Sequence, residues 1–164
     1  MGQKRRHKGL SFLVLISLFS CGNKEGFDEQ KAISKEGLTP KAIVFEVPAQ
    51  ELNNSPQNIF IWLRNNPEYE FSNIFLIATL KVNNEIYIQD TLEYAMTAPD
   101  GSWLGKGFTE LKENKLWWKE GLVIPQEGPV QIEIAQAMRN NGKPEGVLKL
   151  KGIVSLGISI EDQQ

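Results

Sequence analysis

The stretch LKLKGIVSLGISI, residues 148–160, carries the clearest pattern in this chain of 164 residues. Six of its apolar side chains fall on even positions, namely Leu148, Leu150, Val154, Leu156, Ile158 and Ile160. Lysine and serine occupy positions between them. A period of two places alternate side chains on opposite faces of a sheet, so the stretch predicts a β-strand with one face in a core. Gly152 and Gly157 indicate a bend or bulge that splits it into two strands.

The same alternation recurs upstream of this stretch. It appears in residues 43–47, in NIFIWLR (58–64), in EIYIQDTLEY (85–94), in KLWWKE (115–120) and in PVQIEIAQAM (129–138). NIFLIATLKV, residues 73–82, is apolar on both faces and predicts a central strand, and Asn83-Asn84 after it predicts a tight hairpin turn. About seven or eight strands without a strong helix predict an all-β antiparallel β-sandwich. Jelly-roll and immunoglobulin-like topologies fit equally well.

The first 20 residues have the order of a secretory signal peptide. The basic stretch KRRHK is followed by an apolar run over residues 10–19 and by the small residue Ser20. The tetrapeptide Leu18-Phe19-Ser20-Cys21 resembles the bacterial lipobox. The resemblance implies cleavage before Cys21 and a diacylglyceryl group, with fatty chains such as palmitate, on its thiol. The alternative is an ordinary signal peptide followed by an incidental core cysteine.

The charge distribution excludes one class of partner. Of 18 basic side chains, Lys4, Arg5, Arg6 and Lys8 lie in residues 1–20, so the remainder carries 14 basic against 20 acidic side chains, a formal charge of −6. Without a lysine or arginine cluster, this remainder lacks the basic surface that nucleic acid requires. No later segment offers the roughly 18–20 apolar residues of a membrane span. We therefore expect membrane attachment only through lipid on Cys21.

The rest of the chain divides into two parts. Residues 21–40 are polar, contain glycine and show no sustained alternation, so they predict a flexible tether with, at most, a short helix over residues 28–34. Residues 41–164 then form the sandwich domain. Because Cys21 is the only cysteine, we expect this domain to be stable without a disulfide bond.

The inventory of catalytic side chains is poor. His7, the only histidine, is lost with the signal peptide, which leaves no histidine as a base or metal ligand. Asp90, Glu93 and Asp100 lie close in sequence and suit the acid pair of a glycoside hydrolase. Alternation, however, sends Asp90 and Glu93 to opposite faces of a strand. Asp100 belongs to APDG (98–101), which predicts a reverse turn. GSWLGKGF (101–108) lacks the spacing of a phosphate-binding loop. It predicts a crossover that carries Trp103 and Phe108 toward the core.

The tryptophans are the most informative candidates for a binding surface. Trp117 and Trp118 are adjacent, so in a strand they face opposite ways and at most one is in the core if the other face is solvated. Trp62 lies on the face opposite Ile59, Ile61 and Leu63, which raises the same question. An exposed tryptophan is typical of protein interfaces and carbohydrate-binding surfaces. With Trp103, these residues form the candidate interaction surface, unless both faces of their strands are covered.

Several segments form a series behind the lipobox, in the order FIWLRNN (60–66), EFSNIFLIATL (70–80), DTLEYAM (90–96), PDGSWLGKGFTELKENKLWWKE (99–120), QAMR (136–139) and GIVSLGISIE (152–161). Together these segments resemble the gliding motility-associated lipoprotein H family of the Bacteroidota. The resemblance implies a cell-envelope lipoprotein needed for gliding motility and for the associated type nine secretion system. It brings no enzymatic activity, so it implies neither a catalytic residue nor a cofactor.

Three functional hypotheses follow. The first is a tethered interaction protein that contacts other envelope components of gliding and secretion. The second is a carbohydrate-binding surface lipoprotein, in which the tryptophans stack on sugar rings. The third, a hydrolase, needs clustered carboxylates that the strand pattern disfavours. No aspartate directly follows Cys21 to indicate retention in the inner membrane, so we expect the outer membrane, with the domain facing the periplasm.

Overall fold

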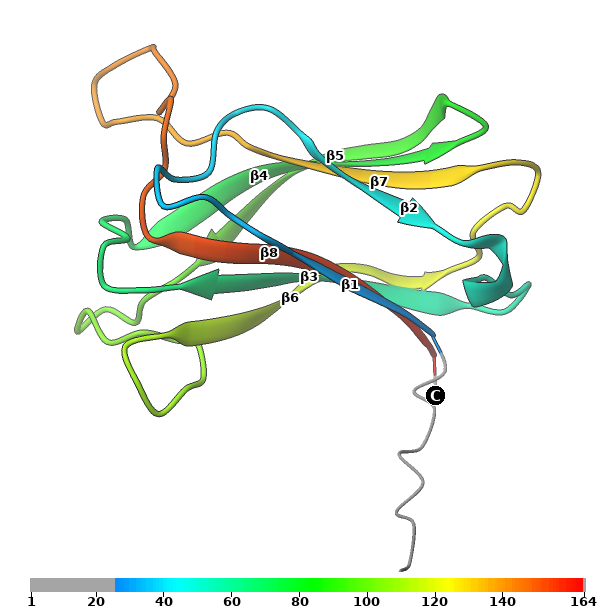
Figure 1. Ribbon diagram of the computed structural model, residues 1–164, viewed down its shortest axis with the longest axis horizontal. Coiled ribbons are helices and arrows are strands. Elements are labelled where there is room, and N and C mark those ends of the chain that lie inside the picture. The colour runs from blue at the N-terminus through cyan, green and yellow to red at the C-terminus, as the bar shows by residue number, and fades with distance from the viewer. Residues whose placement is uncertain (1–25, 164) are drawn as a thin grey trace, which may run out of the picture.

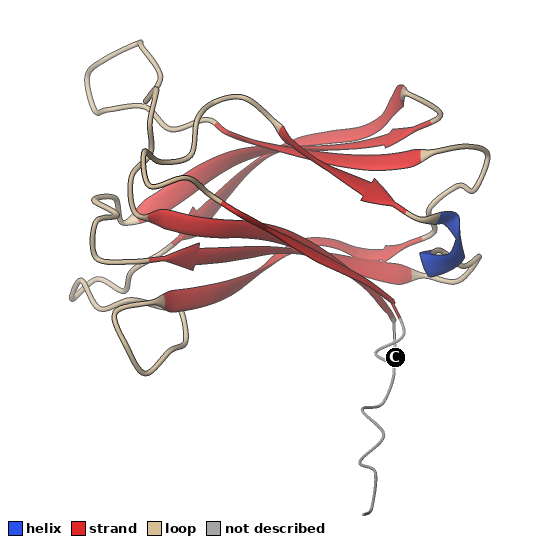
Figure 2. Cartoon of the chain, viewed as in Figure 1, coloured by secondary structure: helices blue, strands red, loops and turns tan. Residues whose placement is uncertain are grey.

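The structure is a computed structural model that describes residues 26–163, and this part of the chain folds into two antiparallel sheets packed face to face (Figures 1 and 2). The first sheet has the order β1 (Gly26–Ala32), β8 (Ile153–Asp162), β3 (Gln57–Asn65) and β6 (Lys112–Leu122). The second has the order β2 (Ile43–Val47), β7 (Val130–Gln136), β4 (Asn73–Val82) and β5 (Glu85–Ala95). A single 3-10 turn, Ala49–Glu51, connects β2 to β3. Within residues 26–163, no helix is long and apolar enough to cross a bilayer.

The order of the strands identifies the topology. Consecutive strands lie in opposite sheets, except for β4 and β5, which form a hairpin within the second sheet. Two four-stranded sheets connected in this way form a jelly roll, in which the edge strands β1 and β2 lie opposite each other at one side and β6 and β5 at the other. The prediction of an antiparallel β-sandwich is confirmed, and the jelly roll replaces the immunoglobulin-like alternative.

The core lies between the inner faces of the two sheets. Fully buried inner residues come from the central strands, namely Ile59, Ile61 and Leu63 on β3, Ile74, Leu76 and Leu80 on β4, Ile132 and Ile134 on β7, and Leu156, Ile158 and Ile160 on β8. Each contributes about 1.5–3 kcal/mol of transfer free energy relative to an exposed side chain. The alternation that these strands show in the sequence is therefore the pattern of one shared core. As predicted, β4 is a central strand.

The hairpin between β4 and β5 turns at the predicted residues. Asn83 and Asn84 have φ angles of 52° and 63°, the left-handed conformation that a tight hairpin requires and that asparagine tolerates better than most residues. Next to the turn, however, the register shifts, because Leu80 pairs with Ile88 but Lys81 pairs with Ile86. The shift leaves Ile86 exposed, although the alternation of β5 predicts it in the core.

The C-terminal stretch also departs from strict alternation. Gly152, with φ of 80°, makes a turn in which a Cβ would lie 2.1 Å from the backbone nitrogen of Tyr69, so the strand begins only at Ile153. In the pairing with β3, Ser155 lies opposite Arg64 and Ile153 lies opposite Asn65, so the register shifts at Val154. Ile153 is therefore buried at the core position that alternation assigns to Val154. Leu148 is exposed. The split predicted at Gly152 occurs, whereas Gly157 lies inside the continuous strand β8.

The prediction of a tether over residues 21–40 is wrong from Gly26 onward. Gly26–Ala32 is strand β1, paired with β8 over the register Gly26↔Glu161 to Ala32↔Ser155, and the predicted short helix is absent there. Alternation missed β1 because it is an edge strand whose only buried apolar side chain is Phe27. The predicted signal peptide and Cys21 lie outside the described residues.

Candidate functional site

The outer face of the first sheet carries a cluster of aromatic side chains around a lysine. We call Phe60, Trp62, Lys115 and Trp117 the aromatic surface. Phe60 pairs with Trp117 across β3 and β6, and their rings meet edge to face with centroids 4.5 Å apart. The Nζ of Lys115 lies 3.9 Å from the ring centroid of Phe60 and 5.4 Å from that of Trp62. Cross-strand aromatic and cation–π contacts of this kind hold the four side chains as a unit.

The polar atoms of the aromatic surface are paired with β8. Trp62 Nε1 donates to Ser159 Oγ at 2.8 Å, and Lys115 Nζ donates to the two carboxylate oxygens of Glu161 at 2.7 and 2.8 Å. Ser159 Oγ in turn donates to Glu161 at 3.2 Å. These bonds fix the ring of Trp62 and the ammonium of Lys115. What this surface offers to a partner is therefore mainly ring area, above all that of Trp117, which is 46% exposed.

Trp117 and Trp118 face opposite ways, as predicted. Trp118 is only 6% exposed and belongs to the core, where it packs between β6 and β5. Trp103 is partly buried at one end of the sandwich, with its ring centroid 6.3 Å from that of Tyr69. Of the four tryptophans in the candidate interaction surface, the structure thus brings Trp62 and Trp117 together and places Trp103 and Trp118 elsewhere.

The edge between β5 and β6 is closed by polar contacts from Trp118 and its neighbours. Trp118 Nε1 donates to Asp90 Oδ2 at 2.9 Å, and Lys119 Nζ lies 2.9 Å from the same oxygen. Burial raises the pKa of Asp90, but these two hydrogen bonds and the charge of Lys119 outweigh it, so the pKa lies below its usual value. Tyr94 donates to the carbonyl oxygen of Trp117 at 2.6 Å. Burial, with a smaller effect of the Asp90 charge, raises the pKa of Tyr94 to about 12.

The three carboxylates considered for acid–base chemistry do not form a common site. Asp90 points inward to Trp118, whereas Glu93 on the outer face of β5 accepts a hydrogen bond from Asn73 at 2.7 Å. Asp100 accepts hydrogen bonds from the backbone and hydroxyl of Ser102 at 2.9 and 2.7 Å, which lower its pKa. Each carboxylate thus has a local structural partner.

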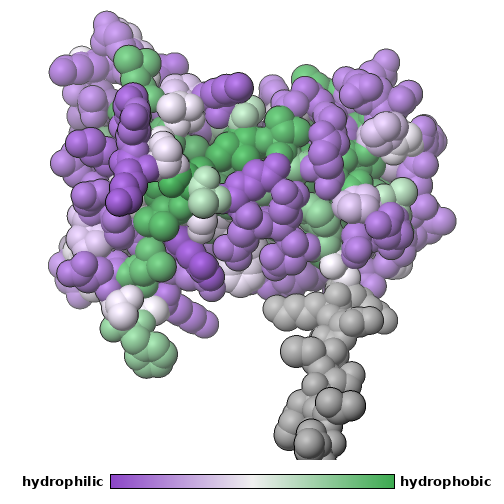
Figure 3. Space-filling view, in the orientation of Figure 1, coloured by the Kyte–Doolittle hydropathy of each residue, from purple (hydrophilic) through white to green (hydrophobic). Residues whose placement is uncertain are grey.

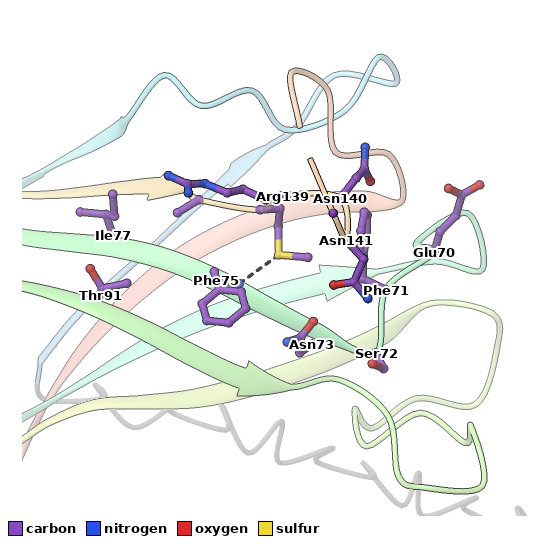
Figure 4. Close-up of a pocket in the computed structure, with 13 residues that line it drawn as sticks. Glu70, Phe71, Ser72, Asn73, Phe75, Ile77, Thr91, Arg139, Asn140 and Asn141 are labelled. Carbon is purple, nitrogen blue, oxygen red and sulfur yellow. Dashed lines mark hydrogen bonds between the residues drawn. The ribbon is translucent and has the colours of Figure 1, made fainter. Parts of the chain in front are cut away.

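A hollow of about 850 Å³ lies at one end of the second sheet's outer face (Figure 4). Its floor comes from β4 and β5, with Phe75, Ile77 and Thr91, and its walls come from residues 70–73 and 137–142. The backbone N–H of Phe75 contacts the sulfur of Met138 at 3.1 Å, which holds the second wall against β4. None of the four tryptophans lines this hollow. Sequence reasoning missed it because its two walls are far apart in the chain.

The connection between β5 and β6 contains Trp103 and Phe108, both predicted to enter the core, and the structure places them in different environments. Trp103 packs against the core and forms an isolated bridge with Thr97, but Phe108 is fully exposed. The prediction for Phe108 is therefore wrong. A turn from Ala98 to Gly101 precedes both residues, as the APDG sequence predicts.

Comparisons with known proteins agree with the resemblance read from the sequence. A family model described as GldH lipoprotein matches residues 27–160. The gliding motility lipoprotein GldH of Flavobacterium johnsoniae is 37% identical over 158 residues, which cover 96% of this chain and 98% of that protein. A gliding motility lipoprotein GldH homolog of Christiangramia forsetii is 41% identical over 151 residues, 92% of each chain.

Among solved structures, dimeric latent PorU of Porphyromonas gingivalis aligns with a TM-score of 0.32 and 11% identity, over 84% of this chain and 13% of that chain. This likeness is too remote to compare the folds. The family match, in contrast, covers most of the sequence, and the two relatives cover nearly all of it. On this evidence the chain belongs to the GldH lipoprotein family.

Proposed function

We propose that this gliding motility lipoprotein acts through protein–protein contacts made by its aromatic surface, and that these contacts also support type nine secretion. Other envelope proteins of gliding and secretion are the expected partners. The observation that carries the proposal is Trp117, a large aromatic side chain held half exposed on the outer face of a regular sheet. A few residues carry most of the binding energy at a protein interface, and tryptophan is often one of them. Such residues pack against the partner where water is excluded.

The shape of the aromatic surface favours a protein over a sugar. Carbohydrate stacking usually needs a concave site with convergent polar groups. Here the indole nitrogen of Trp62 and the ammonium of Lys115 are already engaged by Ser159 and Glu161. Neither the hollow on the second sheet nor a smaller one of about 390 Å³ beside the β4–β5 turn is lined by a tryptophan. The exposed part of this surface is mainly the ring of Trp117 beside the partly buried ring of Trp62, and such an apolar face suits another protein.

The proposal includes a lipid anchor on Cys21 in the outer membrane, with the domain facing the periplasm. Two or three fatty chains at one residue hold a protein stably at a bilayer, whereas a single chain holds it only marginally. Cys21 precedes the first residue of β1 by five positions, so the anchor and the start of the sheet are separated by at most about 17 Å of extended chain. The domain is then held close to the lipid surface.

The test combines Trp117→Ala with Trp62→Ala in the full chain and measures co-purification with gliding and secretion components, spreading of colonies and export of secreted proteins. We expect all three to fall together while the protein level stays constant. Val123→Ala is the matched control, because Val123 is also 46% exposed and apolar but lies beyond the end of β6. Unchanged co-purification and export in the double variant would refute the role of this surface.

A second candidate function, carbohydrate binding, is favoured by the hollow on the second sheet. Phe71 and Phe75 offer ring area there, and Asn140, Asn141 and Arg139 offer hydrogen-bond donors beside them. Calorimetry with a soluble oligosaccharide such as chitotetraose tests this function. Binding that is lost in Phe75→Ala and retained in Trp117→Ala would place a sugar in the hollow, whereas absence of heat with the wild type would reject it for this class of glycan.

A further inference from the structure

A loop between β5 and β6 carries apolar side chains into solvent. We call residues 104–111 the projecting loop. Phe108 at its tip is fully exposed, and Leu104 and Leu111 on either side are also exposed. A fully exposed phenylalanine between two exposed leucines is unusual for a soluble surface and marks a site of contact with an apolar phase.

The exposure of Phe108 results from a defined backbone. Lys106 and Glu113 exchange backbone hydrogen bonds of 2.8 and 2.9 Å at the base of the loop, and Leu104 N–H donates to the carbonyl of Met96 at 3.0 Å. Gly107 has a φ of 156°, and a Cβ there would lie 2.3 Å from the carbonyl oxygen of Leu111. Lys112 Nζ also donates to the carbonyl of Gly107 at 2.8 Å. The loop is thus closed beneath Phe108, and the ring has no route into the core.

The charges beside Phe108 are mainly positive, in contrast to the rest of the domain. Lys106 and Lys112 flank it, and Glu110 is the only acidic residue between them. The carboxylate of Glu113, which follows Lys112, is paired with Arg64 on β3. Residues 21–164, by comparison, carry a net formal charge of −6. An aromatic tip flanked by lysines is complementary to the boundary of a phospholipid bilayer, where rings enter the acyl region and ammonium groups meet anionic headgroups.

The projecting loop lies on the same side of the sandwich as the start of β1. In Figure 1 the first sheet is the lower layer, and both the loop and the beginning of β1 lie along the lower margin, at opposite ends. Figure 3 shows an apolar projection at the position of the loop. Because the proposed lipid on Cys21 is only five residues from β1, the bilayer that holds it lies within reach of this side.

We infer that the projecting loop inserts Phe108, together with Leu104 and Leu111, into the surface of the phospholipid bilayer that holds the lipid anchor. The loop is then a second attachment point at the other end of the first sheet. The inference rests on the proposed lipid on Cys21 for the orientation of the domain. Two points of attachment turn the outer face of the first sheet toward the bilayer, so that a partner of the aromatic surface is a protein of the same membrane.

The experiment uses the full mature chain with Cys21→Ser, which removes the only cysteine, so that Phe108→Cys offers a single thiol for an environment-sensitive fluorophore. Vesicles of phosphatidylethanolamine with phosphatidylglycerol are the probe. We expect a blue shift of the dye at position 108 on adding vesicles and no shift for the matched control Val123→Cys. Flotation compares the Cys21→Ser chain with the same chain carrying Phe108→Asp. We expect the second substitution to lower the ratio of vesicle-bound to free protein by about tenfold or more, because one large apolar side chain no longer leaves water on binding.

Three outcomes overturn the inference. One is a dye at position 108 that does not respond to vesicles. Another is equal flotation of Phe108→Asp and its parent, with unchanged thermal unfolding to show that both are folded. The third is loss of protein co-purification in Phe108→Asp without any change in flotation, which assigns the loop to a protein partner. The intact mass of the wild-type chain purified from membranes tests the anchor separately, because a diacylglyceryl group on Cys21 adds to that mass whether or not the loop binds lipid.

Discussion

At the β5–β6 edge of the sandwich a tryptophan joins the two sheets, whereas at the β1–β2 edge a lysine does so. Trp118 fills the space between β6 and β5 and donates its N–H to Asp90 at 2.9 Å. At the opposite edge Lys31 reaches from β1 to the carbonyl oxygen of Val44 on β2 at 2.5 Å, with its ammonium 5.0 Å from the ring centroid of Phe45. One edge is closed by a buried side chain and the other by a partly exposed one.

The difference follows from what each edge strand contributes to the core. β6 buries Leu116 and Trp118, while β1 buries only Phe27 among its apolar residues. Further along β1, Glu29 and Lys31 form an ion pair of 3.3 Å on the inward side. Inward charges on an edge strand discourage pairing with another molecule and reduce the stability of the edge. We therefore expect the β5–β6 edge to stabilise the fold and the β1–β2 edge mainly to keep it monomeric.

The largest expected effect comes from breaking the β5–β6 edge. Trp118→Ala removes a core side chain that is 6% exposed and leaves a cavity beside Asp90, so we expect the free energy of unfolding to fall by about 3–5 kcal/mol. Urea denaturation followed by circular dichroism measures it. Trp118→Phe is the control, since it keeps ring volume and loses the indole donor, and its loss should be clearly smaller. A loss below about 1 kcal/mol in Trp118→Ala would contradict the role of this edge.

The β1–β2 edge should be less sensitive. Lys31→Met keeps the aliphatic stem and removes the ammonium that bonds to Val44, so we expect a loss of about 1–1.5 kcal/mol, less than for a fully buried charged hydrogen bond. Because the variant also removes an inward charge, light scattering should detect self-association at high concentration. A variant as destabilised as Trp118→Ala would show that the two edges are energetically equal.

A pH dependence distinguishes the edges further. The pKa of Asp90 is lowered in the folded protein, so the stabilisation by its carboxylate is present above its unfolded pKa of about 3.9 and is lost as pH falls through the lower folded value. We expect Asp90→Asn to cost about 1 kcal/mol at pH 7, through the lost attraction to Lys119, and progressively less below pH ~4. Parallel unfolding curves at pH 7 and pH 3 measure it. If Asp90→Asn destabilises the protein as much at pH 3 as at pH 7, the effect does not come from the charge of Asp90.

The smallest effect on stability is expected for the outward neighbour of Trp118. Trp117→Ala removes the edge-to-face contact with Phe60 but leaves no cavity, so we expect a loss of about 0.5–1 kcal/mol. Thermal and urea unfolding beside Trp118→Ala provide the measurement. Near-wild-type stability makes Trp117→Ala a clean probe of binding, whereas a loss of several kcal/mol would mean that Trp117 has a structural role as well.

The sequence could predict the central strands and the opposite faces of Trp117 and Trp118, because these strands bury every second side chain. It could not predict β1, whose paired residues are largely polar on both faces. Nor could alternation choose the jelly roll, since it assigns faces to strands but says nothing of their order in a sheet. Phe108 was misplaced for a related reason. Its exposure depends on the closure of the loop at Lys106 and Glu113, which no periodicity records.

The pairing of β1 with β8 also determines how the domain would respond to tension on the proposed anchor at Cys21. Tension applied at Gly26 along the axis of β1 is shared by all the pairs from Gly26 to Ala32. Tension applied across the strand breaks the same hydrogen bonds one after another, starting at Gly26. The direction from which the membrane pulls on the first residue of the sheet therefore sets whether the domain resists by shear or peels open.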